Sequence, residues 1–234
     1  MPNKALLFDA DGTLYDFPAS ERHALSRLFP SLGIPLNEDT VSLYQKENSL
    51  CWREYEQGLI TVPELKEKRF TLFFSDIGLE ADSHKAGNDF AEYLGEKGVL
   101  FPGAGELLFT LSRDHDLYII TNGFVTTQHR RFTAAGVDGC FKGIFISEKA
   151  GASKPNRAFF DYVFSQVPFT PEEALVIGDS ETSDIRGARD YGIESVFISF
   201  SGKTSSLADH SVHSYQELLA LIQDIDKRDV KNQV

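Results

Sequence analysis

Two aspartates separated by a single residue form the pattern in this chain with the clearest chemical potential. Asp9 and Asp11 belong to the stretch Asp9-Ala10-Asp11-Gly12-Thr13, which follows a short apolar run. Two carboxylates in a tight turn can converge on one cation, or they can divide the tasks of nucleophile and acid between them. An ordinary acidic turn would contain the same residues, so the interpretation depends on what else the chain provides.

Two further clusters are suited to hold an anionic group. Thr121-Asn122-Gly123 offers a hydroxyl, an amide and backbone N–H groups, which together could cradle an oxyanion. Ser153-Lys154-Pro155 offers a lysine, which binds phosphate as a compact point charge. Taken alone, the first segment is also a common turn and the second a common solvated start of a helix.

A second pair of carboxylates lies in the segment Gly178–Asp184. Asp179 follows another apolar run, and Asp184 comes about one helical turn later, near the expected N-terminus of a helix. Carboxylate oxygens are hard ligands of the kind that Mg²⁺ prefers, together with water and substrate phosphate. The alternative for Asp184 is a favourable interaction with the helix dipole alone.

These clusters lie at or beside the ends of short apolar runs that are typical of buried strands. The runs are Ala5–Phe8, Leu117–Ile120, Ile144–Ile146, Leu175–Ile177 and Ser195–Ile198. Helical patterns separate them: after Pro102, over Thr127–Ala135, after Pro155 and over Thr182–Tyr191. This alternation predicts an α/β fold with a doubly wound parallel sheet, which binds ligands at the carboxyl ends of its strands.

The region between about Asp16 and Gly98 shows no strand pattern and several amphipathic stretches. Thr61-Val62-Pro63-Glu64 combines a capping box with a proline in the first turn, which indicates the start of a helix. We therefore predict a helical cap domain over residues 16–98, inserted after the first strand. The catalytic core would then consist of residues 1–15 and 99–234.

The composition excludes several classes of partner. The 234 residues carry a formal net charge of -12, which argues against binding a nucleic acid polymer but not against small anions in a local pocket. Cys51 and Cys140 match no metal or redox spacing. No stretch approaches the ~20 apolar residues that span a bilayer, and the first apolar run is short for a signal peptide. We expect a cytoplasmic protein without a membrane partner.

Taken together, the motifs resemble those of the haloacid dehalogenase-like hydrolase superfamily. The matching residues are Asp9-x-Asp11-Gly12-Thr13, Thr121-Asn122, Lys154-Pro155 and Gly178-Asp179 with Asp184. The resemblance implies a Rossmann-like core, and the long insert looks like the first class of cap in that superfamily. A closer resemblance is to bacterial pyrimidine 5′-nucleotidases that act on noncanonical nucleotides. It rests on Leu14-Tyr15-Asp16-Phe17, Leu50-Cys51-Trp52-Arg53, Glu56-Gln57-Gly58 and Thr121-Asn122-Gly123.

The resemblance also implies roles for individual residues. Asp9 would be the nucleophile and Asp11 the acid and base, while Thr121, Asn122 and Lys154 would bind the substrate. Mg²⁺ would be held by Asp9, the backbone carbonyl of Asp11, Asp179 and Asp184. In the cap, Trp52, Arg53 and Tyr55 are candidates for contacting a base or sugar, although aromatic stripes at helical spacing more often form core.

The expected function is hydrolysis of small phosphate monoesters through an aspartyl-phosphate, with pyrimidine nucleoside 5′-monophosphates as favoured substrates. Alternatives are a phosphatase or mutase for sugar phosphates or phosphoglycolate, and a non-catalytic nucleotide-binding protein on the same fold. A dehalogenase is disfavoured because its chemistry needs no second acid, and Asp11 is present. The choice between Mg²⁺ and Mn²⁺ stays open.

Overall fold

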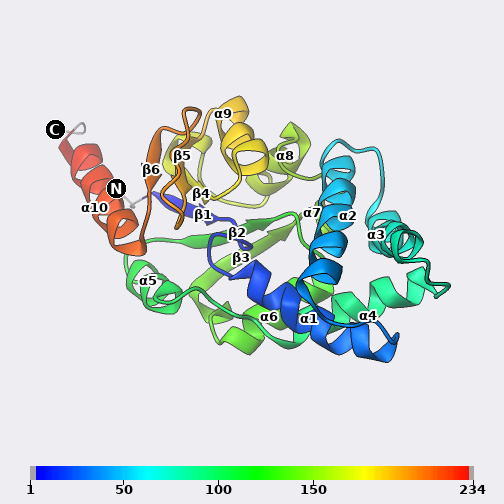
Figure 1. Ribbon diagram of the computed structural model, residues 1–234. Helices are drawn as coiled ribbons and strands as arrows, with labels where there is room; N and C mark the ends of the chain where they lie inside the picture. The colour runs from blue at the N-terminus through cyan, green and yellow to red at the C-terminus, as the bar shows by residue number, and fades with distance from the viewer. Residues whose placement is uncertain (1–3, 232–234) are drawn as a thin grey trace. The chain divides into compact units, whose positions relative to one another are not determined.

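A single parallel sheet carries the candidate site residues in the computed structural model, which describes residues 4–231 (Figure 1). The six strands are arranged in the order β3-β2-β1-β4-β5-β6, and each neighbouring pair is parallel. Their bounds are β1 Ala5–Phe8, β2 Leu117–Thr121, β3 Phe141–Ile146, β4 Ala174–Gly178, β5 Glu194–Ile198 and β6 His210–Val212. The α/β class is therefore confirmed, and all five expected strands are present.

The first strand lies at the centre of the sheet. Leu7 of β1 is in register with Tyr118 of β2 on one side and with Val176 of β4 on the other. Every residue of β1 and β4 except the terminal glycine is an apolar residue buried from solvent, which explains the near-continuous apolar runs. The strand order reverses between β1 and β4, and such a switch point is where open α/β sheets bind ligands.

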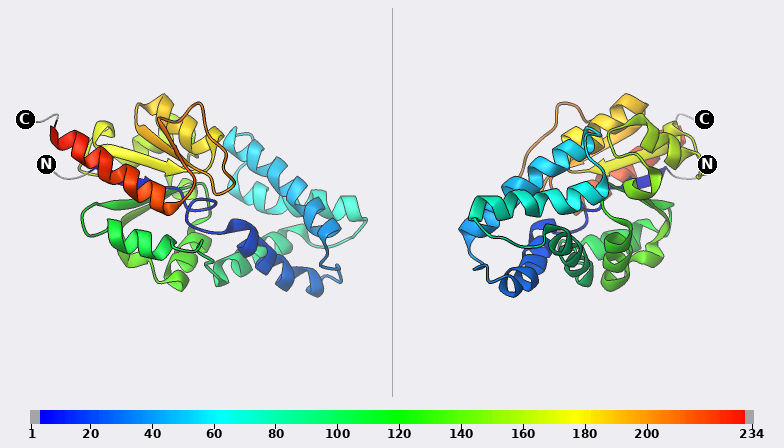
Figure 2. Two further views of the ribbon diagram at one scale, coloured as in Figure 1. Left: turned by 60° about the vertical axis from the view of Figure 1, so that its left-hand side comes forward. Right: turned by 90° about the vertical axis from the view of Figure 1, so that its right-hand side faces the viewer.

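Helices cover both faces of the sheet. α8 (Arg157–Phe164) and α9 (Arg186–Tyr191) lie on one face, where they share a hydrophobic core with β1, β2 and β4 (Figure 1). α5 (Ala104–Leu111) and α10 (Tyr215–Lys231) contact each other on the opposite face (Figure 2, left). The short helix α7 (Ser147–Ala150) follows β3. The expected helix over Thr182–Tyr191 is in fact a π-helical turn, Glu181–Ile185, followed by α9.

Residues Phe17–Val99 and Gly123–Ala135 form a separate compact unit, and the rest of the described chain forms the sheet unit. The first of these, here called the helical unit, contains α1 (Phe17–Ser31), α2 (Glu38–Glu56), α3 (Val62–Ile77), α4 (Ser83–Glu96) and α6 (Val125–Ala135). α3 packs against α2 and α4, and α4 also packs against α1 and α6 (Figure 2, right). A helical region is thus present where the sequence indicated one, and α6 groups with it. The boundaries 16–98 for a cap domain remain a proposal.

Local sequence explains where the helices of this unit begin and how they pack. The capping box that opens α3 is present, since the Thr61 backbone N–H donates to the Glu64 carboxylate over 2.7 Å. The core of the unit is aromatic, with fully buried Tyr44, Phe70 and Phe73 in ring contact with one another or with Phe29.

Among the described residues, no helix is both long and apolar enough to cross a membrane.

Candidate active site

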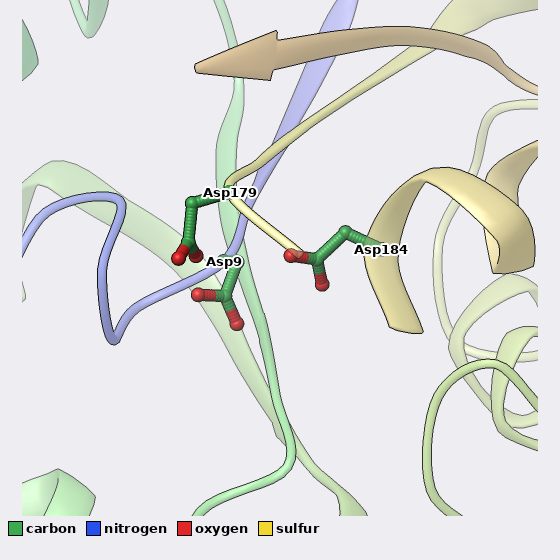
Figure 3. A group of neighbouring side chains, drawn as sticks. All are labelled: Asp9, Asp179 and Asp184. Carbon is green, nitrogen blue, oxygen red and sulfur yellow. The ribbon is translucent and has the colours of Figure 1, made fainter. Parts of the chain in front are cut away.

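Asp9 and Asp179 lie at the carboxyl ends of two adjacent central strands. Asp9 directly follows β1, and its backbone N–H donates to the carbonyl of Ile177 over 2.8 Å, so it is fixed against β4. Asp179 directly follows β4. Because neighbouring parallel strands end at the same edge of the sheet, the two carboxylates are brought together there (Figure 3).

The turn after Asp9 requires glycine at position 12. Gly12 has a φ of 90°, in the left-handed region, and the turn is closed because Leu14 and Tyr15 both donate their N–H groups to the carbonyl of Ala10 over 2.9 Å. A Cβ atom on Gly12 would lie 2.2 Å from an oxygen of Asp179. The glycine therefore permits the close approach of this turn to the second carboxylate.

Asp184 is directed back toward the strand end by the π-helical turn. The N–H groups of Asp184 and Ile185 both donate to the carbonyl of Ser180, over 3.0 and 3.1 Å, which closes the wide turn. The N–H of Ser180 in turn donates to the Asp184 carboxylate over 3.1 Å. A Cβ on Gly178 would lie 2.3 Å from this carboxylate, so the glycine before Asp179 makes room for Asp184.

Lys154 joins the clusters that come from different parts of the chain. Its side chain is 1% exposed, and Nζ donates to Asp9 Oδ1 over 2.7 Å, to Asp184 Oδ1 over 2.6 Å and to the carbonyl of Ile120 over 2.7 Å. These bonds employ all three hydrogens of the ammonium group. The backbone of Lys154 is fixed by the side-chain amide of Asn122, which accepts from Lys154 N over 2.8 Å and donates to its carbonyl over 2.9 Å.

The site has an excess of buried negative charge. Burial raises the pKa of Asp9 well above its ordinary value, although the Lys154 ammonium opposes the shift. Burial and the Asp184 charge raise the pKa of Asp179 to about 7. For Lys154, burial alone would lower the pKa, but the charges of Asp184 and Asp9 outweigh it and raise the pKa above its usual range. One ammonium thus faces three carboxylates.

The three carboxylates fit a divalent cation. One oxygen from each of Asp9, Asp179 and Asp184 lies within 4.8 Å of the other two (Figure 3). Carboxylate oxygens are hard donors of the kind that Mg²⁺ prefers, and the single ammonium of Lys154 neutralises the three carboxylates only in part. The carboxylate of Asp11 does not belong to this group. The expected ligand from that residue is its backbone carbonyl, and this role stays a prediction.

The structure places the remaining expected residues as follows. Thr121 is the last residue of β2 and is 2% exposed, while Asp11 is half-buried in the turn after Asp9. The side chain of Asn122 is engaged with the backbone of Lys154. Its position therefore explains how Lys154 is held, and substrate binding by Thr121 and Asn122 stays a prediction.

The aromatic candidates of the helical unit contact one another. Trp52 stacks on Phe124 with the ring centroids 5.5 Å apart and meets Tyr55 edge-on at 5.7 Å. Phe124 itself is buried, with 3% exposed, among Cys51, Val62 and Leu65. These rings thus form part of the core of the helical unit, and a role in contacting a base stays a prediction.

One contact at the site has no counterpart in the sequence analysis. Thr13 is fully buried, and its hydroxyl donates to Asp179 Oδ1 over 3.3 Å. Thr13 belongs to the first motif, and the motif alone assigns it no role. A hydroxyl directly after the turn glycine is the signal that could have indicated it, because side-chain hydroxyls in turns commonly bond nearby acceptors.

A family model described as haloacid dehalogenase-like hydrolase matches residues 3–192. The chain belongs to this family. Among its relatives, the HAD-hydrolase YfnB of Bacillus subtilis is 39% identical over 196 residues, which cover 83% of each chain. The pyrimidine 5′-nucleotidase PynA of Streptococcus pneumoniae is 35% identical over 221 residues, covering 92% of this chain and 93% of the relative. The pyrimidine 5′-nucleotidase YjjG of Escherichia coli is 29% identical over 222 residues, covering 92% and 96%.

A solved structure agrees with these relationships. The crystal structure of YfnB from Bacillus subtilis, described as bound to magnesium, superposes with a TM-score of 0.89 at 36% identity, covering 95% of this chain and all of that chain. Membership in the family confirms the resemblance drawn from the motifs, the Rossmann-like α/β core and the expectation of an enzyme of the hydrolase class with phosphatase relatives.

Proposed function

We propose that this hydrolase is a magnesium-dependent phosphatase that acts on small phosphate monoesters through an aspartyl-phosphate on Asp9. The observation that supports this most directly is the placement of the Asp9 carboxylate. It is buried at the end of the central strand, accepts a 2.7 Å hydrogen bond from Lys154, and lies among Asp179 and Asp184. A carboxylate held in this way is oriented before the substrate arrives, as nucleophilic catalysis requires.

In the first half of the proposed reaction, an oxygen of Asp9 forms a bond to phosphorus while the ester P–O bond breaks. Asp11 donates its proton to the departing oxygen, so the leaving group departs as a neutral alcohol. In the second half, Asp11 accepts a proton from a water molecule that attacks phosphorus. The bond between phosphorus and Asp9 then breaks, orthophosphate leaves and the carboxylate is regenerated.

Other residues of the chain would stabilise the phosphoryl group. Thr121 at the end of β2 and Lys154 would donate hydrogen bonds to its oxygens. Because all three ammonium hydrogens of Lys154 are engaged, the lysine would exchange one of these bonds for a phosphoryl oxygen. The clamp from Asn122 would keep the lysine backbone fixed during that exchange.

The acidic cluster would hold the cation. Asp9, Asp179, Asp184 and the carbonyl of Asp11 would be its protein ligands, which is consistent with the magnesium in the YfnB structure. When bound, magnesium would neutralise charge between the carboxylates and the phosphate ester. This neutralisation would allow an anionic substrate to approach Asp9 in spite of the neighbouring carboxylates.

For the substrate class, we propose pyrimidine nucleoside 5′-monophosphates. Two relatives that align over more than nine-tenths of this chain are named pyrimidine 5′-nucleotidases, which supports the proposal. A small-molecule substrate and a cytoplasmic location are parts of the same proposal. Phosphatases for sugar phosphates share the same reaction at Asp9, so the substrate test has to include them.

The test is phosphate release from nucleoside monophosphates, sugar phosphates and phosphoglycolate, with Mg²⁺ and with a chelator. Asp9→Asn should lower the rate at least about 10³-fold, because an amide cannot form the phospho-enzyme. Asp161→Asn, on an exposed aspartate of α8, serves as the matched control. Radioactive phosphate from the substrate should remain on acid-quenched native protein and not on Asp9→Asn. Substantial turnover by Asp9→Asn would overturn the mechanism, whereas preference for a sugar phosphate would replace only the substrate.

A further inference from the structure

The turn Ala10–Tyr15 is held from outside as well as by its own backbone. Thr13, at its tip, makes two hydrogen bonds on opposite parts of the residue. Its hydroxyl donates to Asp179 Oδ1 over 3.3 Å, and its carbonyl accepts from the phenol of Tyr215 over 2.7 Å. Tyr215, which lies 202 positions further along the chain, therefore binds the backbone of the turn that contains Asp11 and Thr13.

Tyr215 is itself rigidly placed. It is the first residue of α10 and is 7% exposed. Its ring meets Phe200 edge-on with the centroids 5.1 Å apart, and Phe200 packs on Phe101 at 4.7 Å. The backbone N–H of Phe101 donates to the carbonyl of Leu14 over 2.9 Å. The residue that packs on Phe200 is therefore also bonded to the residue after Thr13.

The hydroxyl, and not only the ring, is the part of Tyr215 that matters. A buried phenol that lacked a partner would cost free energy, so the bond to Thr13 fixes both groups. Burial raises the pKa of Tyr215, which keeps the phenol protonated and able to donate. Phenylalanine would retain the contact with Phe200 and lose only this bond.

The position of the turn has little tolerance. A Cβ on Gly12 would overlap the carboxylate of Asp179, so the turn already lies as close to that side chain as its backbone allows. A small shift of Thr13 would lengthen its bond to Asp179, which is 3.3 Å, and would displace Asp11 in the same turn. Even small displacements of reacting groups lower the rate of the chemical step substantially.

We propose that Tyr215 is a positioning residue of the active site, which holds the Asp11–Thr13 turn against Asp179 through the carbonyl of Thr13. Its kinetic consequences rest on the proposed phosphatase activity, but its effect on the turn does not. Removing the hydroxyl leaves the fold intact and loosens the turn, so the chemical step slows while the affinity for the substrate changes little.

The experiment compares Tyr215→Phe with Tyr191→Phe, which removes a 2.9 Å hydrogen bond of another tyrosine on the opposite side of the sheet unit. Hydrogen exchange of the peptide Asp9–Tyr15 should become about 3- to 10-fold faster in Tyr215→Phe, the range expected for the loss of one hydrogen bond. Exchange in β4 should be unchanged, and Tyr191→Phe should match the native protein in both segments. Unchanged exchange in the turn, or an equal rise in β4, would overturn the proposal.

The kinetic arm uses a double-mutant cycle. Tyr215→Phe should lower kcat about 3- to 10-fold with KM within about twofold. Its effect should differ between the native and the Thr13→Val background, because the hydroxyl of Thr13 and the phenol of Tyr215 restrain the same turn. Losses that multiply in the double variant would overturn the role assigned to Tyr215. If native protein hydrolyses no phosphate ester, the proposed function fails, and hydrogen exchange alone decides whether Tyr215 holds the turn.

Discussion

Replacing Lys154 by methionine should reveal the buried charge of the site as a pH-dependent loss of stability. Nζ makes three hydrogen bonds of 2.6 to 2.7 Å, two of them to carboxylates, and the side chain is 1% exposed. Removing one partner of a buried ion pair costs about 3–5 kcal/mol, because the other charge remains buried. For a chain of this size, that corresponds to a fall in Tm of roughly 10 °C.

The direction of the pH dependence follows from the carboxylates. The pKa values of Asp9 and Asp179 are raised in the folded protein, and the Lys154 charge opposes both shifts. A group with a raised folded pKa stabilises the protein at low pH, and that contribution is lost as pH rises through the folded pKa, which is about 7 for Asp179. Without Lys154 the pKa values of both aspartates rise further. The loss of stability in the variant should therefore be largest above neutral pH and should become smaller as pH falls and the carboxylates bind protons.

The measurement is thermal unfolding by circular dichroism in the presence of a chelator, at about pH 8 and about pH 5.5, either side of that value. Lys149→Met, on an exposed lysine in α7, is the matched control and should leave Tm nearly unchanged at both pH values. An equal loss of stability at both pH values in Lys154→Met, or no loss at either, would contradict the role given to the buried carboxylates.

Two further predictions concern the backbone strain at Gly12 and the buried charge of Glu194. Gly12→Ala and Gly136→Ala both place a side chain at positive φ, at a cost of about 1 kcal/mol each, but only the first overlaps Asp179. Phosphate release should therefore fall at least about 10-fold only in Gly12→Ala, and thermal unfolding should shift at least as far in Gly12→Ala as in Gly136→Ala; equal activities would contradict this account. Burial would raise the pKa of Glu194, but hydrogen bonds led by that from Lys4 lower it to about 2, so its stabilisation is present above the ordinary value of 4.5 and is lost as pH falls toward 2. In urea unfolding, Glu194→Gln should lose on the order of 1–2 kcal/mol at neutral pH and much less near pH 2, and a pH-independent difference would argue against it.

The sheet could be predicted from sequence because its central strands are buried on both faces. Ala5–Phe8 and Leu175–Ile177 are uninterrupted apolar runs, and short runs of this kind are typical of strands that helices cover on both faces. The edge strand β6 gave no such signal, because its three residues His210–Val212 are mostly polar. The π-helical turn was also missed, since no local preference distinguishes it from the first turn of α9.

The order of the site residues could be predicted, but their contacts could not. The sequence placed Asp9 and Asp179 at strand ends, and a parallel sheet then requires those ends to meet. It could not show that the Asn122 amide is engaged with the backbone of Lys154, because that contact depends on the path of the loops after β2 and α7. Tyr215 was out of reach for the same reason, since nothing near it in the chain is chemically distinctive.

The division of the chain between its two units has a consequence for recombination. The chain passes from one unit to the other after Asp16, after Val99, after Asn122 and after Ala135, so the helical unit is built from two separate segments. The second of these is anchored to the first by the stacking of Phe124 on Trp52 and by the bond from the Thr127 hydroxyl to the carbonyl of Ala91. An exchange of helical units between relatives that transferred only the long segment would break these contacts and leave α6 with a foreign partner. A viable chimera should therefore carry Gly123–Ala135 from the same parent, even though that segment begins directly after Asn122, the residue that clamps Lys154.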